Sequence, residues 1–320
     1  MVPRLHFAHL PTPVEPASRL ADSLGLHYLY IKRDDQTGLA LGGNKARKLE
    51  FLVAEAQRVN ARTLLTTGAL QSNHCRQTAA AAAKFGLNCI LVLVGDQPAK
   101  ASGNLLLDHL LGANIVWVNN IEEREMVVQE TFELAKKNGG QPYLVPYGGS
   151  SPTGVLGYAY ALKELMDQDV NPDWIIFATS SGGTQAGLVL GARWWGFKGR
   201  ILGISVDQPA SGFSSRIADL ATQASRLIGE DWNFSSEEVL INDEYCFPGY
   251  GVLTQVEKDA IRLFAQTEGV LLDPVYTGRA AAGLVDLAGK GFFLKDDRIV
   301  FWHTGGQPAL FAEKYSQLVE

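Results

Sequence analysis

The sequence is short of cysteine, of long apolar runs and of net positive charge, and each shortage excludes a class of protein. The cysteines, Cys75, Cys89 and Cys246, are odd in number and widely spaced, so they indicate neither a disulfide framework nor a zinc site. The longest apolar runs, such as Cys89–Val94 and Trp174–Ala178, have strand length and fall far short of a membrane span. The first residues carry too many prolines and polar breaks for a signal peptide. We therefore expect a cytoplasmic protein with no metal site and no membrane partner.

Charge and composition are those of an ordinary globular protein. Hydrophobic residues make up 46% and charged residues 19% of the 320 residues, which lies outside the disordered range. The formal net charge is −6 at pH 7, so no basic field attracts nucleic acid. A chain of this length can bury one large α/β core or form two modest lobes.

Short apolar stretches alternate with longer amphipathic stretches along most of the chain, which predicts parallel sheet with helical crossovers. A glycine- and serine-rich junction near Gly148–Thr153 separates two such series. The predicted strands are Leu26–Ile31, Thr63–Thr67, Cys89–Val94, Ile115–Val118, Pro142–Val145, Trp174–Ala178, Ile201–Val206 and Ile299–Trp302. The predicted helices are Ala17–Leu24, Lys45–Val59, Asn73–Phe85, Ser102–Leu111, Ile121–Asn138, Gly154–Asp167 and Thr184–Trp195.

A serine- and glycine-rich turn, Thr179–Thr184, lies between an apolar strand and a helix. Backbone N–H groups at a helix start, together with hydroxyls, suit a phosphate because the helix dipole also favours negative charge. The turn has neither the Walker pattern nor GxGxxG. The alternative is a tight turn whose polar residues only cap the helix.

A lysine follows a glycine pair at the start of a helix in Gly42–Lys48. Partial burial and the positive end of the helix dipole both lower an amine's pKa, so Lys45 is a candidate nucleophile for a Schiff base. The alternative is a basic surface patch, because Arg47 and Lys48 lie beside Lys45.

A second polar helix start occurs at Gly68–Arg76. Ser72 and Asn73 can donate hydrogen bonds beside helix N-terminal amides, which suits a carboxylate; the alternative is a plain N-cap. The local sequence favours bystander roles in the chemistry for His74 and Cys75, because neighbours in sequence rarely face each other.

Two tyrosines lie in turns, Tyr250 in Phe247–Gly251 and Tyr276 in Leu272–Gly278. A phenol can act as an acid or base if a nearby cation lowers its pKa, but a packed aromatic ring with a bonded hydroxyl is the more common role. The polar turn His303–Gly306 follows a strand, at the kind of strand end where α/β proteins bind ligands.

Together these motifs resemble one known family. In chain order they are Gly42–Lys48 (GGNKARK), Gln71–Arg76 (QSNHCR), Thr179–Thr184 (TSSGGT), Asp273–Gly278 (DPVYTG) and His303–Leu310 (HTGGQPAL). Over nearly its whole length the chain resembles the 1-aminocyclopropane-1-carboxylate deaminase/D-cysteine desulfhydrase family of fold-type-II pyridoxal-phosphate enzymes. The resemblance implies a tryptophan synthase β-like α/β fold with two domains, each holding a mainly parallel sheet flanked by helices. The larger domain would combine residues 1–50 and 153–320, and the smaller would be residues 51–152.

The resemblance also implies pyridoxal 5′-phosphate as cofactor, held by Lys45 as a Schiff base. Asn73 would hydrogen-bond its phenolic oxygen, and Ser72 with neighbouring amides would receive the substrate carboxylate. The implied cofactor-binding residues are Lys45, Asn73, Ser180, Ser181, Gly182, Gly183, Thr184 and Thr304. The implied catalytic residues are Lys45, Ser72, Tyr250 and Tyr276, and the implied substrate-binding residues are Ser72, Asn73, His74, Tyr250 and Tyr276.

Two positions separate members of the family. In the deaminases of this family, a glutamate follows the DPVY tyrosine and can hydrogen-bond the pyridine nitrogen of the cofactor; here that residue is Thr277. Their terminal motif reads HLGG, and here Thr304 stands in place of the leucine. A hydroxyl stabilises a protonated pyridine less than a carboxylate does. Both threonines resemble the D-cysteine desulfhydrase branch, which argues against opening a cyclopropane ring.

We therefore expect β-elimination of D-cysteine to pyruvate, ammonia and hydrogen sulfide. The alternatives are L-cysteate sulfo-lyase, 1-aminocyclopropane-1-carboxylate deaminase, an amino-acid racemase and, in a different class, a cofactor-binding protein without turnover. The family resemblance implies a homodimer, and the sequence indicates no nucleic-acid partner.

Overall fold

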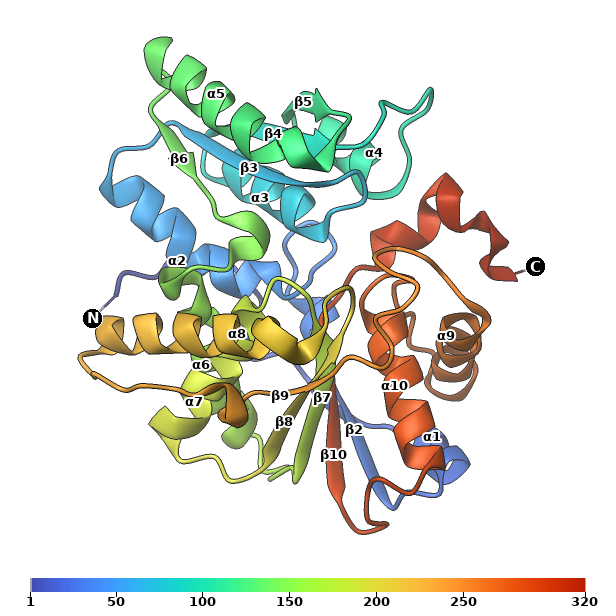
Figure 1. The fold of residues 1–320 in the computed structure, drawn as a ribbon. Coiled ribbons are helices and arrows are strands. Elements are labelled where there is room, and N and C mark those ends of the chain that lie inside the picture. Colours follow the sequence, from blue (N-terminus) through green and yellow to red (C-terminus); the bar gives the residue numbers. More distant parts are fainter. Residues whose placement is uncertain (1, 320) are drawn as a thin grey trace.

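The computed structural model describes residues 2–319 and contains two sheets with helices packed against them (Figure 1). The larger sheet has the order β1-β2-β10-β7-β8-β9 and the smaller has the order β5-β4-β3-β6. This arrangement confirms the predicted α/β fold with two sheets flanked by helices. The domain boundaries at residues 50/51 and 152/153 stay a prediction.

The six-stranded sheet is parallel except at one edge, where β1 pairs antiparallel with β2. Its strands are β1 (Val14–Pro16), β2 (Tyr28–Arg33), β7 (Trp174–Thr179), β8 (Arg200–Ser205), β9 (Leu240–Asn242) and β10 (Arg298–His303). Because β7 and β10 are parallel neighbours, the turns that follow them emerge at the same edge of the sheet.

The four-stranded sheet is parallel throughout. Its strands are β3 (Thr63–Ala69), β4 (Asn88–Val94), β5 (Asn114–Val118) and β6 (Pro142–Leu144). Figure 1 shows α5 on one face of this sheet and α3 on the other. The carboxyl ends of β3 and β6 lead directly into the polar segments that begin at Ser72 and Tyr147.

The helices cover both faces of the larger sheet, with α1, α9 and α10 on one face and α6 and α7 on the other (Figure 1). The α-helices are α1 (Ser18–Leu24), α2 (Lys45–Arg58), α3 (Asn73–Lys84), α4 (Gly103–Leu110), α5 (Arg124–Lys137), α6 (Pro152–Met166), α7 (Gly183–Trp195), α8 (Ala210–Ser225), α9 (Gln255–Glu268) and α10 (Thr277–Gly289). The 3-10 helices are η1 (Asp34–Gln36), η2 (Ile121–Glu123), η3 (Tyr147–Gly149), η4 (Arg226–Ile228), η5 (Ser236–Glu238), η6 (Gln307–Phe311) and η7 (Glu313–Val319). No helix in residues 2–319 is long and apolar enough to cross a membrane.

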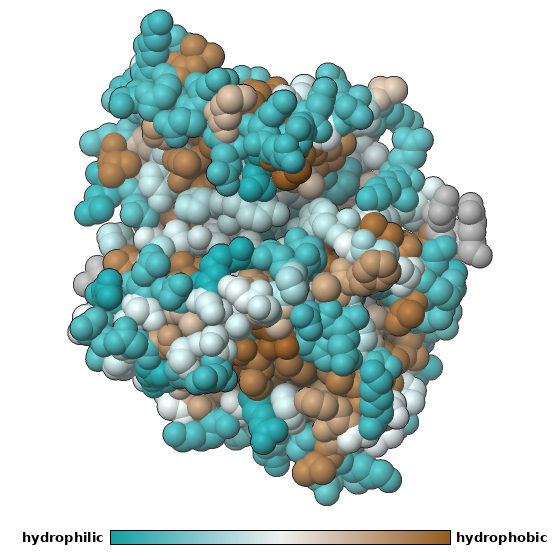
Figure 2. Space-filling view, viewed as in Figure 1, coloured by the Kyte–Doolittle hydropathy of each residue, from teal (hydrophilic) through white to brown (hydrophobic). Residues whose placement is uncertain are grey.

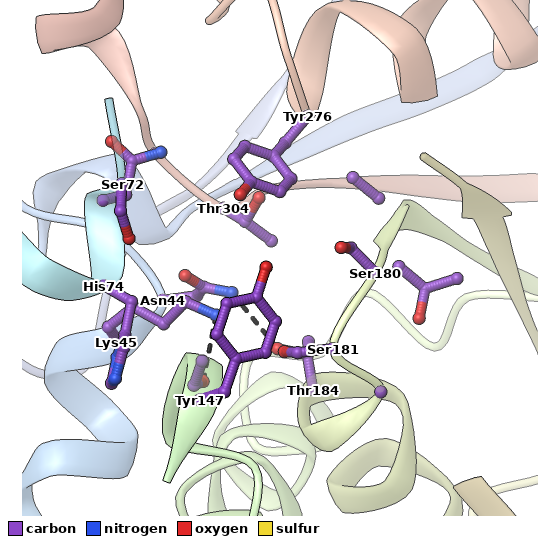
Figure 3. Close-up of a pocket in the computed structure, with 16 residues that line it drawn as sticks. Asn44, Lys45, Ser72, His74, Tyr147, Ser180, Ser181, Thr184, Tyr276 and Thr304 are labelled. Carbon is purple, nitrogen blue, oxygen red and sulfur yellow. Dashed lines mark hydrogen bonds between the residues drawn. The ribbon is translucent and has the colours of Figure 1, made fainter. Parts of the chain in front are cut away.

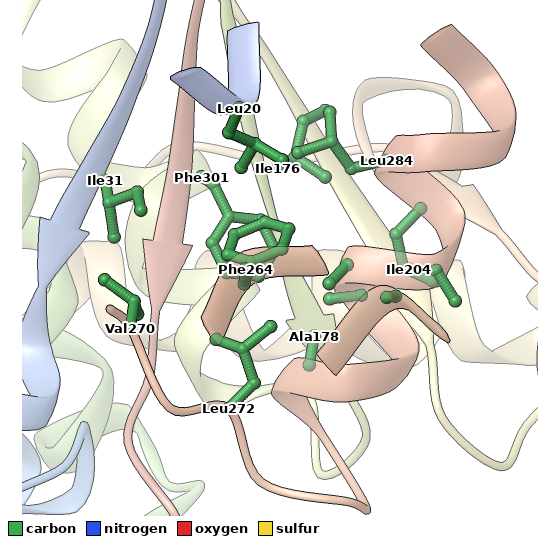
Figure 4. Packing of buried hydrophobic residues seen from close by; sticks show 14 of the residues in the cluster. Leu20, Ile31, Ile176, Ala178, Ile204, Phe264, Val270, Leu272, Leu284 and Phe301 are labelled. Carbon is green, nitrogen blue, oxygen red and sulfur yellow. The ribbon is translucent and has the colours of Figure 1, made fainter. Parts of the chain in front are cut away.

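Apolar side chains from strands and helices fill the space on the α9–α10 side of the larger sheet (Figure 4). Phe264 of α9 and Phe301 of β10 form its centre, with ring centroids 5.0 Å apart. Ile176, Ile204 and Leu284 pack around them. On the molecular face in Figure 2, hydrophilic residues cover most of the upper part and hydrophobic ones gather in the lower half. The buried core around Phe264 and Phe301 fixes β7 and β10, and the polar turns follow the carboxyl ends of these two strands.

The sequence predicted the central elements with ends shifted by at most three residues. The prediction that α6 begins at Gly154 was two residues late, because Ser151 caps the helix and Pro152 opens it. Helix α5 begins at Arg124, because the preceding turn is the 3-10 helix η2. The short strands β1 and β9 and the helices α8 and α9 were not predicted.

Candidate active site

A pocket opens where the carboxyl ends of both sheets converge (Figure 3). It is lined by Asn44, Lys45, Ser72, Asn73, His74, Tyr147, Gly148, Ala178, Thr179, Ser180, Ser181, Gly182, Thr184, Tyr276, Thr304 and Gly305. Figure 3 shows Lys45 and Ser180 flanking the pocket, with the hydroxyls of Tyr147 and Tyr276 directed toward one another. The location agrees with the rule that α/β proteins bind ligands beyond the carboxyl ends of their strands.

Lys45 is the first residue of α2, and its amine faces the pocket. Its Nζ donates a hydrogen bond to the backbone oxygen of Gly148, 3.1 Å away. Burial lowers the pKa of Lys45 to about 8. The alternative of a basic surface patch is wrong, because the side chains of Arg47 and Lys48 are buried. Lys45 is therefore a buried amine at the pocket, and its role as the nucleophile stays a prediction.

The turn between β7 and α7 has the arrangement of donors that the sequence predicted for an anion. Gly182 caps α7 with a φ of 84°, and the amides of the first helical turn have no intrahelical acceptors. The Ser150 hydroxyl fixes the turn: it donates to Ser181 Oγ at 2.9 Å and accepts from the amide of Gly183 at 3.1 Å. The Thr179 hydroxyl is buried and has no partner in the described chain. Asn44 ties the turn to α2 by donating to Thr184 Oγ1 at 3.1 Å.

The start of α3 forms another wall of the pocket. Ser72 caps the helix, because its hydroxyl accepts from the amide of Cys75 at 3.2 Å, so the predicted N-cap is present. The hydroxyl can still donate its own hydrogen into the pocket. The Asn73 side-chain oxygen accepts from Asn104 Nδ2 at 2.8 Å, which orients the amide.

His74 lines the pocket but is bonded on its far side. Its Nε2 lies 2.9 Å from Thr66 Oγ1, and the Thr66 hydroxyl donates to Val145 O. The histidine Nε2 therefore carries the hydrogen and Nδ1 is the bare nitrogen. Burial lowers the pKa of His74 well below its usual value, with further lowering from Lys45 and Lys48. His74 is thus a neutral wall of the pocket.

Tyr250 and Tyr276 form a pair, with their hydroxyl oxygens 2.7 Å apart. Tyr276 lines the pocket, whereas Tyr250 contacts it through Tyr276. Burial raises the pKa of both phenols, and no cation among the described residues is a cause that lowers either pKa. The pair therefore consists of protonated donors at neutral pH, and a catalytic role for either tyrosine stays a prediction.

The two threonines that separate family members face different surroundings. The Thr277 hydroxyl is fully buried, donates to Asp273 Oδ1 at 2.7 Å and accepts from the Asp273 amide. Its bonds therefore stabilise the DPVY turn, and it does not line the pocket. Thr304 lines the pocket, and its backbone oxygen accepts from the amide of Asn44 at 2.9 Å.

Sequence reasoning missed several residues of the site. Tyr147 and Gly148 follow the carboxyl end of β6, a position that could have flagged them. Asn44 follows the Gly42-Gly43 pair and precedes the lysine. Arg279, which does not line the pocket but supports it, had no local signal: it lies one turn beyond Tyr276 and is buried, and it donates to the backbone oxygens of Val206, Gly249 and Val252. It thereby holds the loop that carries Tyr250.

The side chains suit the cofactor that the resemblance implied. Of the described residues that line the pocket, none is an Asp or a Glu, and the turn before α7 offers amides and hydroxyls to a phosphate. The unpartnered Thr179 hydroxyl adds a donor there. On the opposite side, the Lys45 amine can condense with an aldehyde. Elsewhere in residues 2–319, no group of His, Cys, Asp and Glu could hold a metal ion.

Comparisons with known proteins agree with this chemistry. The model of the pyridoxal-phosphate dependent enzyme family matches residues 5–305. A crystal structure of an ACC deaminase homologue has 38% identity and a TM-score of 0.91, covering 99% of this chain and 96% of that chain. Threonine deaminase isoform 2 of Solanum lycopersicum, in its processed form, has 18% identity and a TM-score of 0.65, covering 96% and 83%. A fungal L-serine ammonia-lyase from Rhizomucor miehei has 18% identity and a TM-score of 0.67, covering 98% of both chains. The last two similarities concern the fold alone.

Proposed function

Because this chain belongs to the family of pyridoxal-phosphate-dependent enzymes, we propose that it catalyses the β-elimination of D-cysteine to pyruvate, ammonia and hydrogen sulfide. Its cofactor is pyridoxal 5′-phosphate. The fold with two sheets and the pocket at their carboxyl ends supports this class of reaction.

Residues on two sides of the pocket would hold the cofactor. Lys45 would bind it covalently, and the turn Ser180–Thr184 would hold its phosphate through amides and hydroxyls. Asn73 and Thr304 also line the pocket; Asn73 would hydrogen-bond the phenolic oxygen of the cofactor, and Thr304 would lie beside its ring. When bound, the cofactor withdraws electrons from Cα of an amino acid and makes the Cα proton removable.

Lys45 is the base in this proposal. Its amine, with a pKa near 8, is partly unprotonated at neutral pH, and the Gly148 oxygen stabilises the ammonium formed when it takes the Cα proton. Ser72 would receive the substrate carboxylate, because it lines the pocket at the start of α3, where its hydroxyl can donate and the first amides have no intrahelical acceptors.

The tyrosine pair would assist the leaving group. Both phenols stay protonated at neutral pH, so Tyr276 can donate a hydrogen bond to a departing thiolate. Tyr250 can in turn donate to Tyr276 across their 2.7 Å contact. The sulfur would leave as hydrogen sulfide, and hydrolysis of the remaining enamine yields pyruvate and ammonia.

The observation that carries the proposal is the charge of the pocket. Among the described residues that line it, Lys45 is the sole Lys or Arg. A substrate whose side chain bears a second anion, such as the sulfonate of L-cysteate, would find no dedicated partner there. A pocket with one cation for chemistry and hydroxyls elsewhere suits a neutral thiol side chain.

Deaminase activity on 1-aminocyclopropane-1-carboxylate is the second candidate, because a solved ACC deaminase homologue is 38% identical to this chain. Against it stands the absence of a carboxylate among the described lining residues: Thr304 lines the pocket and Thr277 is bonded to Asp273. A racemase needs the same proton removal and stays an alternative, as does a cofactor-binding protein without turnover. A homodimer and a cytoplasmic location also stay proposals.

The test is product analysis with cofactor-loaded protein and four substrates: D-cysteine, L-cysteine, L-cysteate and 1-aminocyclopropane-1-carboxylate. We expect equal amounts of pyruvate and sulfide, with the highest kcat/KM for D-cysteine. Faster release of sulfite from L-cysteate would show that the pocket-charge argument is wrong. Formation of 2-oxobutyrate from the cyclopropane substrate at a comparable rate would overturn the argument from the two threonines.

A further inference from the structure

Lys48 is a buried lysine that ends the motif Gly42–Lys48 and has no role in the proposed function. It lies on α2 three residues after Lys45, so the two side chains share one face of the helix. Its side chain has no exposed surface. No acidic side chain in residues 2–319 lies within ion-pair distance of its amine. Burying a charged lysine without a carboxylate partner costs free energy, so we expect Lys48 either to be neutral or to have a role that offsets this cost.

The amines of Lys45 and Lys48 converge on one backbone oxygen. Lys45 Nζ lies 3.1 Å and Lys48 Nζ lies 3.2 Å from the oxygen of Gly148. Both amines thus lie at one acceptor, near enough for each to change the pKa of the other. Two donors at one acceptor leave one nitrogen lone pair free to accept from the other amine, provided that one of the amines is neutral.

The groups around this pair favour a single positive charge. His74 on α3 is neutral, and burial raises the pKa of the Cys75 thiol well above its usual value. Burial lowers the pKa of Lys48 well below that of a free lysine, and the nearby Lys45 lowers it further. Lys45 is the more basic partner, because the nearby Lys48 amine raises the pKa of Lys45 against the effect of burial. Two amines this close titrate as a coupled pair, and the first proton resides mainly on Lys45.

We propose that Lys48 is a positioning residue for Lys45: its neutral amine accepts a hydrogen bond from the Lys45 ammonium and stabilises the proton that Lys45 takes up. The inference rests on the proposed function only for the source of that proton, the substrate Cα. When the Cα–H bond breaks, the new N–H bond forms on Lys45. The resulting ammonium then donates one hydrogen to Gly148 O and another to Lys48 Nζ. Without Lys48, the buried Lys45 ammonium would have the Gly148 oxygen as its one remaining acceptor of this pair.

The first test is independent of turnover. The Cε carbons of the full-length chain are labelled with ¹³C at lysine, and the titration of Lys45 and Lys48 is followed by NMR with and without cofactor. Without cofactor, we expect Lys45 to titrate near pH 8 and Lys48 to remain neutral across that transition. Lys48→Met should shift the Lys45 midpoint down by about one pH unit. Lys45→Met should shift the Lys48 midpoint up.

Two further variants separate this role from a merely structural one. Lys48→Gln retains an acceptor, the amide oxygen, and should recover part of the Lys45 shift. Lys84→Met changes an exposed lysine at the end of α3 and should leave the midpoint unchanged. An unchanged or raised Lys45 midpoint in Lys48→Met would overturn the proposal, as would a wild-type Lys48 that titrates like a free lysine.

The second test uses the loaded enzyme. Lys48→Met should lower kcat for D-cysteine about tenfold with little change in KM, because the variant alters proton transfer and not binding. The isotope effect with α-deuterated substrate should increase. If the NMR shifts hold but no D-cysteine is consumed by the wild type, the inference stands and the proposed function fails. If turnover is present but kcat and the isotope effect are unchanged, the inference fails alone.

Discussion

At the scale of single residues, the chemistry of the site depends on what each side chain contacts. The place of Lys45 after a glycine pair made it a candidate nucleophile with a basic surface patch as the alternative, and only the family resemblance favoured the nucleophile. The tyrosines could be found but not their protonation, since burial and their mutual contact arise only in the folded chain. Thr277 could be compared with a family position, but its bond to Asp273 became visible only in the structure.

Tyr147 is the residue on which we expect substrate size to depend. Its ring lines the pocket and is packed from outside by the Arg124 guanidinium, 5.1 Å from the ring centroid. Tyr147→Phe should keep the preference for D-cysteine over S-alkyl derivatives, because the ring remains. Tyr147→Ala should reduce that preference about tenfold, because removing a pocket wall costs 1–3 kcal/mol of discrimination. Competition kinetics measure the ratio; equal ratios in both variants would show that Tyr147 does not limit substrate size.

Asp108 of α4 predicts a pH dependence of stability. Its carboxyl is buried with no hydrogen-bond partner in the described chain, and burial raises its pKa to about 7 against the opposing effect of Arg76. An unfolded aspartate titrates near pH 4, so between about pH 4 and 7 the native state binds a proton that the unfolded state has lost. The free energy of unfolding should therefore fall as the pH rises through this window.

The variant Asp108→Asn has no carboxyl group at this position, so it has no pH-dependent contribution from residue 108. Relative to wild type, it should gain about 2–4 kcal/mol of stability between pH 5 and pH 8, measured by urea denaturation. Comparing the two proteins cancels the contributions of other titrating groups. Parallel stability profiles for the two proteins would contradict the raised pKa of Asp108.

At the scale of elements, the 3-10 helix η3 (Tyr147–Gly149) connects the two sides of the site. Gly148 supplies the oxygen that holds Lys45, while Tyr147 presents its ring to the pocket. Gly148 and Gly149 both have a φ of 65°, a conformation that side chains with a Cβ rarely adopt. Only this backbone brings the Gly148 oxygen to the amines of α2.

A pair of glycine variants tests the importance of this close approach. A Cβ on Gly148 would lie 2.3 Å from Ser181 Oγ, whereas a Cβ on Gly196, with a φ of 74°, meets nothing within 4 Å. Both Gly148→Ala and Gly196→Ala should lose about 1 kcal/mol of stability from backbone strain. Only Gly148→Ala should also lose cofactor affinity, at least tenfold, in a fluorescence titration. Equal affinities would show that the contact with Ser181 is not needed for binding.

The elements themselves were largely predictable, with physical reasons for the failures. Helix α2 has a clear amphipathic periodicity, and strand β7 is a continuous apolar run of strand length. The strand β9 has three residues and is defined by pairing with β8, which no local pattern encodes. Helix α9 was missed although a capping box, Thr254 with Glu257, marks its start in the sequence.

At the scale of the whole molecule, a buried ionic network connects the site to the larger sheet. Arg47 of α2 donates to Asp34, after β2, at 2.8 Å and to Glu164 of α6 at 2.9 Å. Lys32 of β2 also donates to Glu164. The sequence shows these charges but not their convergence, because Glu164 is more than a hundred residues from both Arg47 and Lys32. The network fixes the start of α2, and with it Lys45, against the sheet.

Removing one carboxylate from this network should destabilise the protein in a pH-dependent way. Burial by itself would raise the pKa of Asp34, but Arg47 and Lys32 lower it to about 2. A lowered native pKa contributes stability above about pH 4, and this contribution is lost as the pH falls toward 2. Asp34→Asn should therefore cost about 3–5 kcal/mol at pH 7, because Arg47 keeps a buried charge with one partner fewer.

Chemical denaturation at pH 7 and pH 3 checks this prediction. The difference between wild type and Asp34→Asn should shrink at pH 3, where the wild type begins to lose the contribution of the carboxylate. A difference that is small at pH 7, or that grows on acidification, would contradict the role assigned to the network.

The central claim is that the Lys45 amine, held by Gly148 beside Lys48, carries the cofactor. Reduction of the loaded protein with borohydride, followed by protease digestion and mass spectrometry, locates the attachment directly. We predict the phosphopyridoxyl group on Lys45 in a single peptide from α2, and no labelled peptide in Lys45→Ala. Attachment to Lys48 or to another lysine in the wild type, or no covalent attachment at all, would contradict the account.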